Sequence, residues 1–482
     1  GVPVNRTNEG LLSFRRFGGT LKHRTAYAGA TTGQQLLYAL DEQVRKFESN
    51  QTVEKYEGWE FIGLVKDESG TCRGIVAQNL RTMEIQSFSA DATVMATGGN
   101  GVIFGRSTNS IINSGSPVSI CYQQGAVYGN PEMVQIHPTA VPGEDKCRLM
   151  SESVRGEGGR LWVPRDVNDS RAAFDIPESD RWYFCEELDP VYGNLLSRDL
   201  VSFIIYCVCR KGMGVKGRQQ VYLDITHLRH KKGMSRELIQ DKLGGVLEIY
   251  DNFMREDPIN VPMRIYPAVH YTMGGLWVDY ETSGNEVALD NQSARNQKTS
   301  ITGLYAAGEC EYQYHGANRL GANALLTCLT GGELAAQGVL AYLTNLDKGH
   351  EDLPSSLWRL QSELLTAKEK VNEIAQRADQ CGLLDAGSWS NQAVPFTRTL
   401  KHMAEMSKAI LEGAIIRDES RGAHFKLDTP ERDDDKCLVT TKATWTPAGP
   451  EIDLNEKVDC RVLAPRPRKY KINQNKVARF IL

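Results

Sequence analysis

Five short segments place histidine, arginine and carboxylate side chains in glycine-rich surroundings. They read IHPT from residue 136, SESVRGEGG from 151, SRD from 197, VHYTMGG from 269 and HGANRLGAN from 315. Glycine lets the backbone approach a ligand closely, and loops carry many binding residues. A lone His or Arg in a loop is more often a structural hydrogen-bonding group. Because a guanidinium binds a carboxylate through two parallel hydrogen bonds, the set as a whole suggests a site for a small molecule with a carboxylate at each end.

A second group of residues could bind hydroxyls and anions. Glu309 follows a short apolar run at 303–307, where it could accept hydrogen bonds from a ribose or ribitol. The segment GANALL, from residue 321, is expected to open a helix whose free N–H groups and dipole can receive an anionic or electron-rich ligand edge. Taken alone, these residues fit an ordinary strand, loop and helix crossover equally well.

The elements that must position these residues follow from the hydrophobic pattern. Apolar residues recur at helical spacing over 33–48, behind Thr32 as a candidate N-cap, which predicts a surface helix with one buried face. Residues 59–66 and 71–78 predict two strands joined by the turn DESG. The apolar run 92–97 predicts a buried parallel strand whose carboxyl end meets a ligand.

Residues 132–269 carry a more mixed pattern, with Gly-rich and charged loops around helical stretches, and we interpret them as an inserted domain. The strand pattern returns over 303–307, and a long helix is expected over about 323–343. Further helices are predicted over 240–253, 357–380 and 396–417.

Bulk composition narrows the class of protein. The 60 acidic and 56 basic side chains nearly cancel, so no overall field would recruit nucleic acid. No uninterrupted apolar stretch approaches the roughly 20 residues that span a bilayer, the best being 201–209. Eleven cysteines without a C-x-x-C pair fit a reduced compartment and give no metal site. We therefore expect a globular protein that reaches a membrane only through partners.

The ordered motifs resemble the flavoprotein family of succinate dehydrogenase, fumarate reductase and L-aspartate oxidase. Their order is HPT, SESVRGEGG, SRD, HYTMGG, AAGE and HGANRLGANALL, and such a string is very specific. The segments RRFGGTLKHRTAYAGATTGQQLLYALDEQ and RDESRGAHFK look like the quinone-linked succinate dehydrogenase branch. The resemblance covers essentially the whole chain, and it thins over 163–181 and beyond about 438.

This resemblance implies an α/β fold. A Rossmann-like FAD-binding domain, here without its front part, would be interrupted by an inserted α+β capping domain and followed by a helical domain and a C-terminal segment. The expected bounds are 1–131 with 270–348 for the FAD-binding domain, 132–269 for the capping domain, 349–430 for the helical domain and 431–482 for the C-terminal segment.

The resemblance also implies roles for individual residues around the substrate. Arg198 would be the proton donor or acceptor, with Glu152 and Arg155 as the proton relay behind it. Phe17 would pack near the substrate. The two carboxylates of succinate or fumarate would be held by His137, Ser151, Glu152, His270 and Arg319.

For FAD, the resemblance implies contacts at two places, and we expect no metal site in this chain. Thr97, Gly98 and Gly99 would lie near the adenosine half. The ribitol and the isoalloxazine edge would meet Glu309, Asn323, Ala324 and Leu325.

Two family features are not found in this sequence. Relatives begin with a strand and a G-x-G-x-x-G turn for the pyrophosphate, and quinone-linked ones then present a His that bonds covalently to flavin. His23 lies in a different motif and is not assigned that link. Because residues 1–6 read as mid-protein sequence, we expect an N-terminally incomplete flavoprotein subunit that uses FAD. The alternatives are an L-aspartate oxidase and a shortened, non-catalytic scaffold.

Partners follow from the same resemblance. The chain has no cysteine spacing of the iron–sulfur cluster type, so electrons must leave the flavin through another protein. The family implies an iron–sulfur subunit and a membrane cytochrome b anchor. It also implies a peripheral position at the cytoplasmic face of a bacterial inner membrane, or at the matrix face in mitochondria.

Overall fold

The structure is a computed structural model. It describes residues 1–15, 22–143, 145–230, 233–284, 288–346, 393–426, 428–461, 463–466 and 474–481. Phe17, the predicted helix over 357–380 and most of the predicted helical domain lie outside the described residues. Within that domain, the prediction over 396–417 corresponds to helix α10, Ala393–Ile416.

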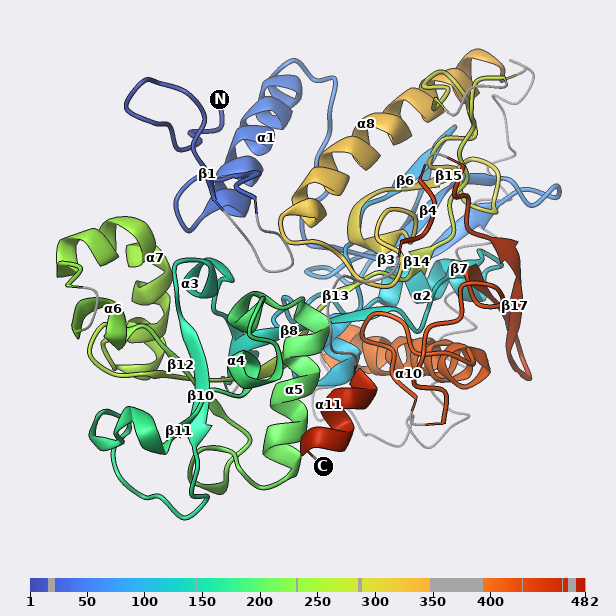
Figure 1. The fold of residues 1–482 in the computed structure, drawn as a ribbon. Helices are drawn as coiled ribbons and strands as arrows, with labels where there is room; N and C mark the ends of the chain where they lie inside the picture. Colours follow the sequence, from blue (N-terminus) through green and yellow to red (C-terminus); the bar gives the residue numbers. More distant parts are fainter. Residues whose placement is uncertain are drawn as a thin grey trace.

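A mixed layer of helices and one antiparallel sheet forms the green part of Figure 1. In the described residues this sheet has six strands in the order β11-β10-β12-β13-β8-β9. The strands are β8 Val134–Val141, β9 Arg148–Leu149, β10 Arg160–Pro164, β11 Arg181–Trp182, β12 Val221–Asp224 and β13 Met263–Thr272. The helices are α3 Ser153–Gly156, α4 Phe184–Leu188, α5 Arg198–Arg210, α6 Thr226–His230 and α7 Arg236–Met254.

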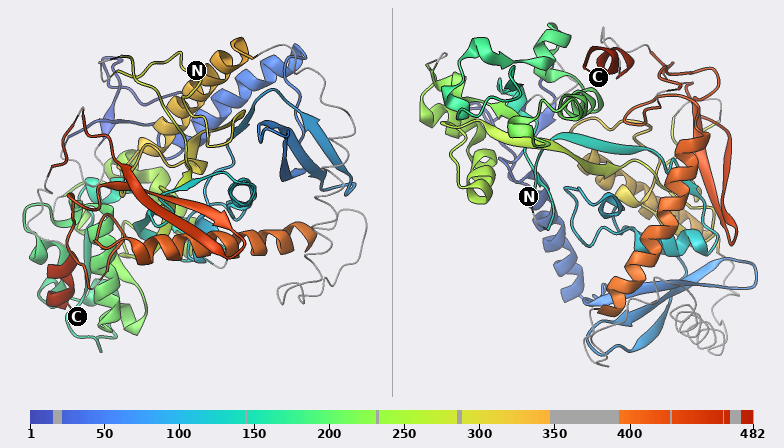
Figure 2. Two further views of the ribbon diagram at one scale, coloured as in Figure 1. Left: turned by 90° about the vertical axis from the view of Figure 1, so that its right-hand side faces the viewer. Right: turned by 90° about the horizontal axis from the view of Figure 1, so that it is seen from below.

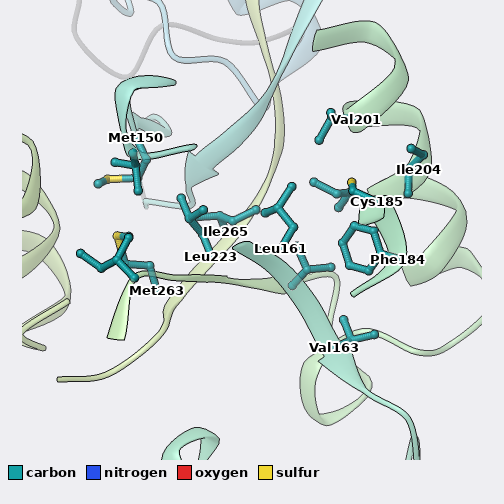
Figure 3. Close-up of a cluster of buried hydrophobic side chains, with 14 of the residues drawn as sticks. Met150, Leu161, Val163, Phe184, Cys185, Val201, Ile204, Leu223, Met263 and Ile265 are labelled. Atoms are coloured by element: carbon teal, nitrogen blue, oxygen red, sulfur yellow. The ribbon is translucent and has the colours of Figure 1, made fainter. Parts of the chain in front are cut away.

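Helices α5 and α7 cover this sheet because each carries an apolar face. The sequence RDLVSFIIYCVCR of α5 is apolar over most of its length, and Ser235 caps α7 by accepting a hydrogen bond from the Leu238 N–H. Their buried side chains join those of the strands in one core, part of which is shown in Figure 3. This core fixes the position of α5, whose first residue is Arg198.

The second part is built around a parallel pair of strands, β6 Thr93–Met95 and β15 Leu304–Ala306. A three-stranded antiparallel sheet flanks it in the described residues, formed by β3 Trp59–Lys66, β4 Cys72–Asn79 and β5 Ile85–Ser89. Further elements are β1 Phe14–Arg15, β2 Thr25–Ala26, β7 Tyr128–Gly129, β14 Gly275–Leu276, α1 Thr32–Ser49, α2 Ser116–Gln123 and α8 Asn323–Thr344.

Helix α1 corrects one expectation. The periodic spacing correctly predicts the helix, but its predicted apolar face is not buried: Leu37 and Phe47 are 64% and 50% exposed. Helix α8 lies beside α1 (Figures 1 and 2), where a Leu325 methyl comes within 3.9 Å of an ideal Cβ at Gly33. These side chains stay exposed because α8 covers only part of the apolar face of α1 in the described residues.

Strand β6 corrects a second expectation. It pairs in parallel with β15 as predicted, yet only Met95 is buried while Val94 is 45% exposed. The exposure of Val94 shows that one face of β6 is not fully covered by the described residues. Full burial of such a strand requires helices on both faces.

The C-terminal residues complete both parts instead of standing apart. Strands β16 Val439–Thr446 and β17 Gly449–Lys457 extend the sheet of β14 and β7. Helix α11, Gln474–Ile481, packs along α5 (Figure 1) and buries Val477 and Ile481 in the core of the first part. The boundary predicted at 269 falls inside β13, which runs from one part into the other.

Among the described helices, α8 is long and apolar enough to cross a membrane, judged by length and composition. The search for uninterrupted apolar stretches did not find this helix, because Glu333 and other polar residues interrupt it. A single helix of this kind is weak evidence for a membrane span, since core helices of globular proteins share its composition.

Candidate active site

Strands β8 and β13 bring two histidines together. His137 lies on β8 and His270 on the neighbouring β13, and their ring centroids are 5.0 Å apart. The pairing passes from Val269 opposite Ile136 to Tyr271 opposite Gln135, so His270 is an extra residue in the ladder. Such bulges re-aim side chains beside active sites. Here the bulge turns His270 toward the site side of the sheet.

Hydrogen bonds define the protonation of both rings. The Thr139 N–H donates to His137 Nδ1 over 3.2 Å, which leaves the proton of the neutral ring on Nε2. For His270, Arg319 lies 3.5 Å from Nε2 and the Thr108 hydroxyl 2.7 Å from Nδ1. Since guanidinium can only donate, Nδ1 of His270 carries the proton and donates to Thr108.

Burial keeps both imidazoles neutral. Burial, reinforced by Arg198, Arg155 and Arg319, holds the pKa of His137 well below its usual range. The pKa of His270 is lowered in the same way, by burial first and by His137 next. Both rings therefore act on a ligand as hydrogen-bonding groups and not as cations.

Arg319 is the guanidinium on the other side of His270. It is 7% exposed, and its guanidinium carbon lies 4.6 Å from the centroid of the Tyr271 ring. Burial lowers the pKa of Arg319 to about 10, with Arg198 as the next cause, so the group stays charged at neutral pH. The loop before α8 thus presents a fixed positive charge to the histidine pair.

Arg198, Glu152 and Arg155 form a buried chain of charges. Arg198 Nη2 donates to Glu152 Oε2 over 3.1 Å, and Arg155 Nη2 donates to Glu152 Oε1 over 2.8 Å. Arg155 continues to the carbonyl of the half-buried Asn194, 2.6 Å away. The structure therefore brings together the three residues predicted as donor and relay, in the predicted order.

Gln135 connects Arg198 with the loop of Arg319, and the sequence analysis did not predict a role for it. Its Oε1 accepts a 2.7 Å hydrogen bond from Arg198 Nη1, while its Nε2 donates to the Arg319 carbonyl over 2.6 Å and to Asn318 Oδ1 over 3.0 Å. Alternate residues of a strand share a face. The position of Gln135 two residues before His137 on β8 was the signal that could have found it.

The charges of this cluster suit a doubly negative ligand. Three guanidiniums, those of Arg155, Arg198 and Arg319, face the single carboxylate of Glu152 in this group, and the histidines are neutral. This positive excess, which the nearby carboxylates of Asp199 and Glu309 reduce, suits a ligand with carboxylates. Buried charges need partners of opposite sign, so such a ligand would stabilise the site.

Ser151 stands at the edge of the cluster. Its half-buried hydroxyl accepts hydrogen bonds from the backbone and side chain of Ser153. It is brought near the cluster by its chain neighbour, Glu152. Phe17 lies outside the described residues.

Glu309, predicted to contact the cofactor, lies beside the end of the strand that carries His270. Its Oε1 accepts a 3.0 Å hydrogen bond from the N–H of Thr272, two residues after His270 on β13. A Cβ at Gly99 would lie 2.4 Å from the same oxygen, so a larger residue there would displace the Glu309 carboxylate. Burial raises the pKa of Glu309 to about 7. Two predicted cofactor residues therefore meet at the carboxyl ends of β6 and β15.

The remaining predicted cofactor residues surround this point. Gly98 has a left-handed backbone with φ +75°, and Thr97 is exposed. Asn323, Ala324 and Leu325 open α8, which has no side-chain cap on its first N–H groups. A carboxylate packed against a glycine and an uncapped helix start fit the hydroxyls and electron-rich edge of FAD.

A parallel strand pair that ends at a buried carboxylate, beside a cluster with an excess of guanidinium groups, fits one class: flavin-dependent oxidoreductases of small carboxylic acids. Sequence comparison agrees. The family described as FAD binding domain matches residues 1–325, and that described as fumarate reductase flavoprotein C-term matches residues 355–470.

Individual relatives are of the same kind. The chain is 47% identical to the succinate dehydrogenase flavoprotein subunit of Bacillus subtilis, over 99% of this chain and 83% of the relative. It is 30% identical to the fumarate reductase flavoprotein subunit of Escherichia coli, over 98% and 80%. A solved quinol-fumarate reductase with menaquinol molecules superposes with a TM-score of 0.80 at 26% identity, over 97% of this chain and 83% of that one.

The chain belongs to the succinate dehydrogenase and fumarate reductase flavoprotein subunit family. It is an oxidoreductase, and its cofactor is FAD. These findings confirm the predicted family, the predicted fold class and the predicted cofactor.

Proposed function

We propose that the buried cluster of His137, His270, Arg319, Arg198 and Glu152 binds a four-carbon dicarboxylate and interconverts succinate and fumarate. The observation that carries the proposal is the continuous link between the groups: His137 against His270, His270 to Arg319, Arg319 through Gln135 to Arg198, and Arg198 to Glu152. Groups from five separate parts of the chain meet in one place.

In this proposal the binding groups divide the two carboxylates between them. Arg319 and the histidines hold one carboxylate, and Ser151 with the nearby residues of its loop holds the other. The neutral rings donate or accept hydrogen bonds without adding charge. Pinning both ends fixes which carbon faces the proton donor, which is the main contribution of positioning to rate.

Arg198 delivers the proton. In fumarate reduction, the bound flavin in its reduced form would supply the hydride for one alkene carbon. A guanidinium N–H of Arg198 gives its proton to the other carbon, so the double bond becomes two C–H bonds. Glu152 and Arg155 then return a proton to Arg198. In succinate oxidation the same groups carry the proton outward.

The test is substitution of Arg198 by alanine in the holoenzyme. We expect turnover to be abolished while dicarboxylate affinity changes by less than about tenfold, because the donor acts in the chemical step. Turnover with a soluble dye and titration of flavin absorbance with malonate measure the two quantities. Robust residual turnover would contradict the role of Arg198.

The same preparation decides between related substrates. L-Aspartate oxidase, the alternative within the resemblance, predicts faster turnover with aspartate than with succinate. Our proposal predicts the reverse. A protein that binds FAD and malonate yet turns over neither would instead support the scaffold alternative.

We also propose that the chain works in a membrane-bound complex with an iron–sulfur subunit and a cytochrome b anchor, peripheral to the cytoplasmic face of a bacterial membrane or to the mitochondrial matrix face. The solved relative is a quinol-fumarate reductase with menaquinol molecules, which supports a quinone as electron partner. Among the described residues no group of His, Cys, Asp and Glu could hold a metal ion. Co-purification of an iron–sulfur protein with the tagged chain tests the assembly.

A further inference from the structure

The motif RDESRGAHFK, residues 417–426, has no part in the site described above, yet it lies against two of its supports. Arg417 is 1% exposed and anchors the segment. Its Nε donates to Glu132 Oε1 over 2.5 Å, its Nη1 to Glu419 Oε1 over 3.0 Å, and its Nη2 to the Val439 carbonyl over 3.0 Å. The start of the motif is thus fixed to the residues just before β8 and to β16.

Gly422 lies in close contact with the loop that carries Arg319. Arg421 and His424 exchange backbone hydrogen bonds of 2.9 and 3.1 Å, which closes a tight turn and presents Gly422 with φ +62°. A Cβ at Gly422 would lie 1.9 Å from the Ala317 carbonyl oxygen. Ala317 precedes Arg319 by two residues. The turn therefore supports the Arg319 loop directly, backbone against backbone.

Phe425, three residues further on, touches the helix that carries Arg198. Its ring centroid is 4.6 Å from that of Phe203 on α5. The same helix is also bonded to β8, because the Ser202 hydroxyl donates to the Ile136 carbonyl over 3.1 Å. Phe425 thus supports α5 by packing on Phe203, a residue of that helix.

We propose that residues 417–425 form a positioning brace that sets the placement of Arg319 relative to Arg198. Gly422 positions Arg319 through its loop, and Phe425 positions Arg198 through α5, while Arg417 ties both contacts to one anchor. Neither Gly422 nor Phe425 belongs to the binding group proposed above. The inference rests on the roles proposed above for Arg198 and Arg319.

The two contacts predict opposite kinetic effects. Gly422→Ala should displace the carboxylate-binding Arg319, raising the Kd for malonate and the KM for succinate about tenfold while kcat per bound FAD stays within about threefold. Phe425→Ala should displace the donor Arg198, lowering kcat about tenfold while the Kd for malonate stays within about threefold. Phe425→Leu, which keeps an apolar contact, should recover most of the lost kcat.

Matched controls separate positioning from general instability. Gly217→Ala introduces a Cβ at φ +68° with no atom within 4 Å, so it tests backbone strain alone. Phe253→Ala removes a 52% exposed ring that packs under Arg148. Both controls should leave kcat and the Kd for malonate per bound FAD unchanged.

Two results would overturn the brace: both variants matching the unsubstituted protein per bound FAD, or both losing kcat and affinity in the same proportion. If Gly422→Ala yields no holoenzyme, the Phe425 pair decides alone, because unaltered kcat in Phe425→Ala contradicts the inference. Arg198→Ala in the same assays keeps the two proposals distinct. An active Arg198→Ala refutes the proposed function, whereas an inactive one beside unaffected brace variants refutes only the brace.

Discussion

Replacing Gln135 by leucine tests whether the proton donor is held from the side as well as by Glu152. Leucine has nearly the same volume but cannot accept the 2.7 Å hydrogen bond from Arg198 or donate the 2.6 Å bond to the Arg319 carbonyl. Because Gln135 is 1% exposed, water cannot readily replace these partners. The substitution therefore acts on both arginines of the site from a single position.

The expected size follows from the lost bonds. A hydrogen bond to a charged group contributes about 1.5–3 kcal/mol. If that loss displaces Arg198 from the reacting carbon, kcat falls by about tenfold to about 150-fold, since roughly 1.4 kcal/mol corresponds to a factor of ten. The lost bond to the Arg319 carbonyl should raise the KM by a smaller factor of about three to ten.

Steady-state turnover per bound FAD measures kcat and KM, and malonate titration measures binding. Gln123→Leu is the matched control, because that amide bonds Ser119 and His402 and no site residue. We expect the control to change thermal stability and leave kcat unaltered. A Gln135→Leu enzyme with kcat within about twofold of the unsubstituted protein would refute the reasoning, provided that Arg198→Ala is inactive.

Three other substitutions test separate parts of the structure. Gly99→Ala places a Cβ 2.4 Å from Glu309 Oε1, so FAD content should fall by at least about tenfold, read from the flavin absorbance; full FAD content would contradict the cofactor assignment. Thr108→Val removes the acceptor of the His270 Nδ1 proton and should raise the KM for succinate about tenfold, and an unchanged KM would remove His270 from the binding group. Burial raises the pKa of Glu311 from 4.5 to about 8, so the folded protein keeps a proton that the unfolded chain releases, and this contribution to stability is lost as pH rises through that window. As pH rises from about 5 to about 8, the Tm of Glu311→Gln should therefore increase relative to that of the unsubstituted protein. Parallel curves of Tm against pH would refute this.

Local order could be read from the sequence because it depends on short-range spacing. The helices α1, α7, α8 and α10 and the hairpin of β3 and β4 were predicted close to their observed bounds. Motif order gave the family, which the comparisons confirm. The residue roles carried over with that family remain predictions, and the experiments above address them.

Burial and contact were decided by tertiary structure, because they depend on which distant segments pack together. The apolar spacing of α1 could not tell that its face would be left exposed at Leu37 and Phe47. The C-terminal residues looked like a separate segment, yet β16 and β17 join the sheet of β7, and α11 packs on α5.

The site shows the same division. Residue types near His137, Arg198 and Arg319 indicated a pocket for a diacid, since guanidinium and imidazole chemistry does not depend on the fold. That Gln135 bridges two of these residues, and that residues 417–425 contact the Arg319 loop and α5, required the packing of strands and loops far apart in the chain. Sequence determined which chemistry was possible, and the fold decided which groups share it, because hydrogen bonds and close contacts act only over a few ångströms.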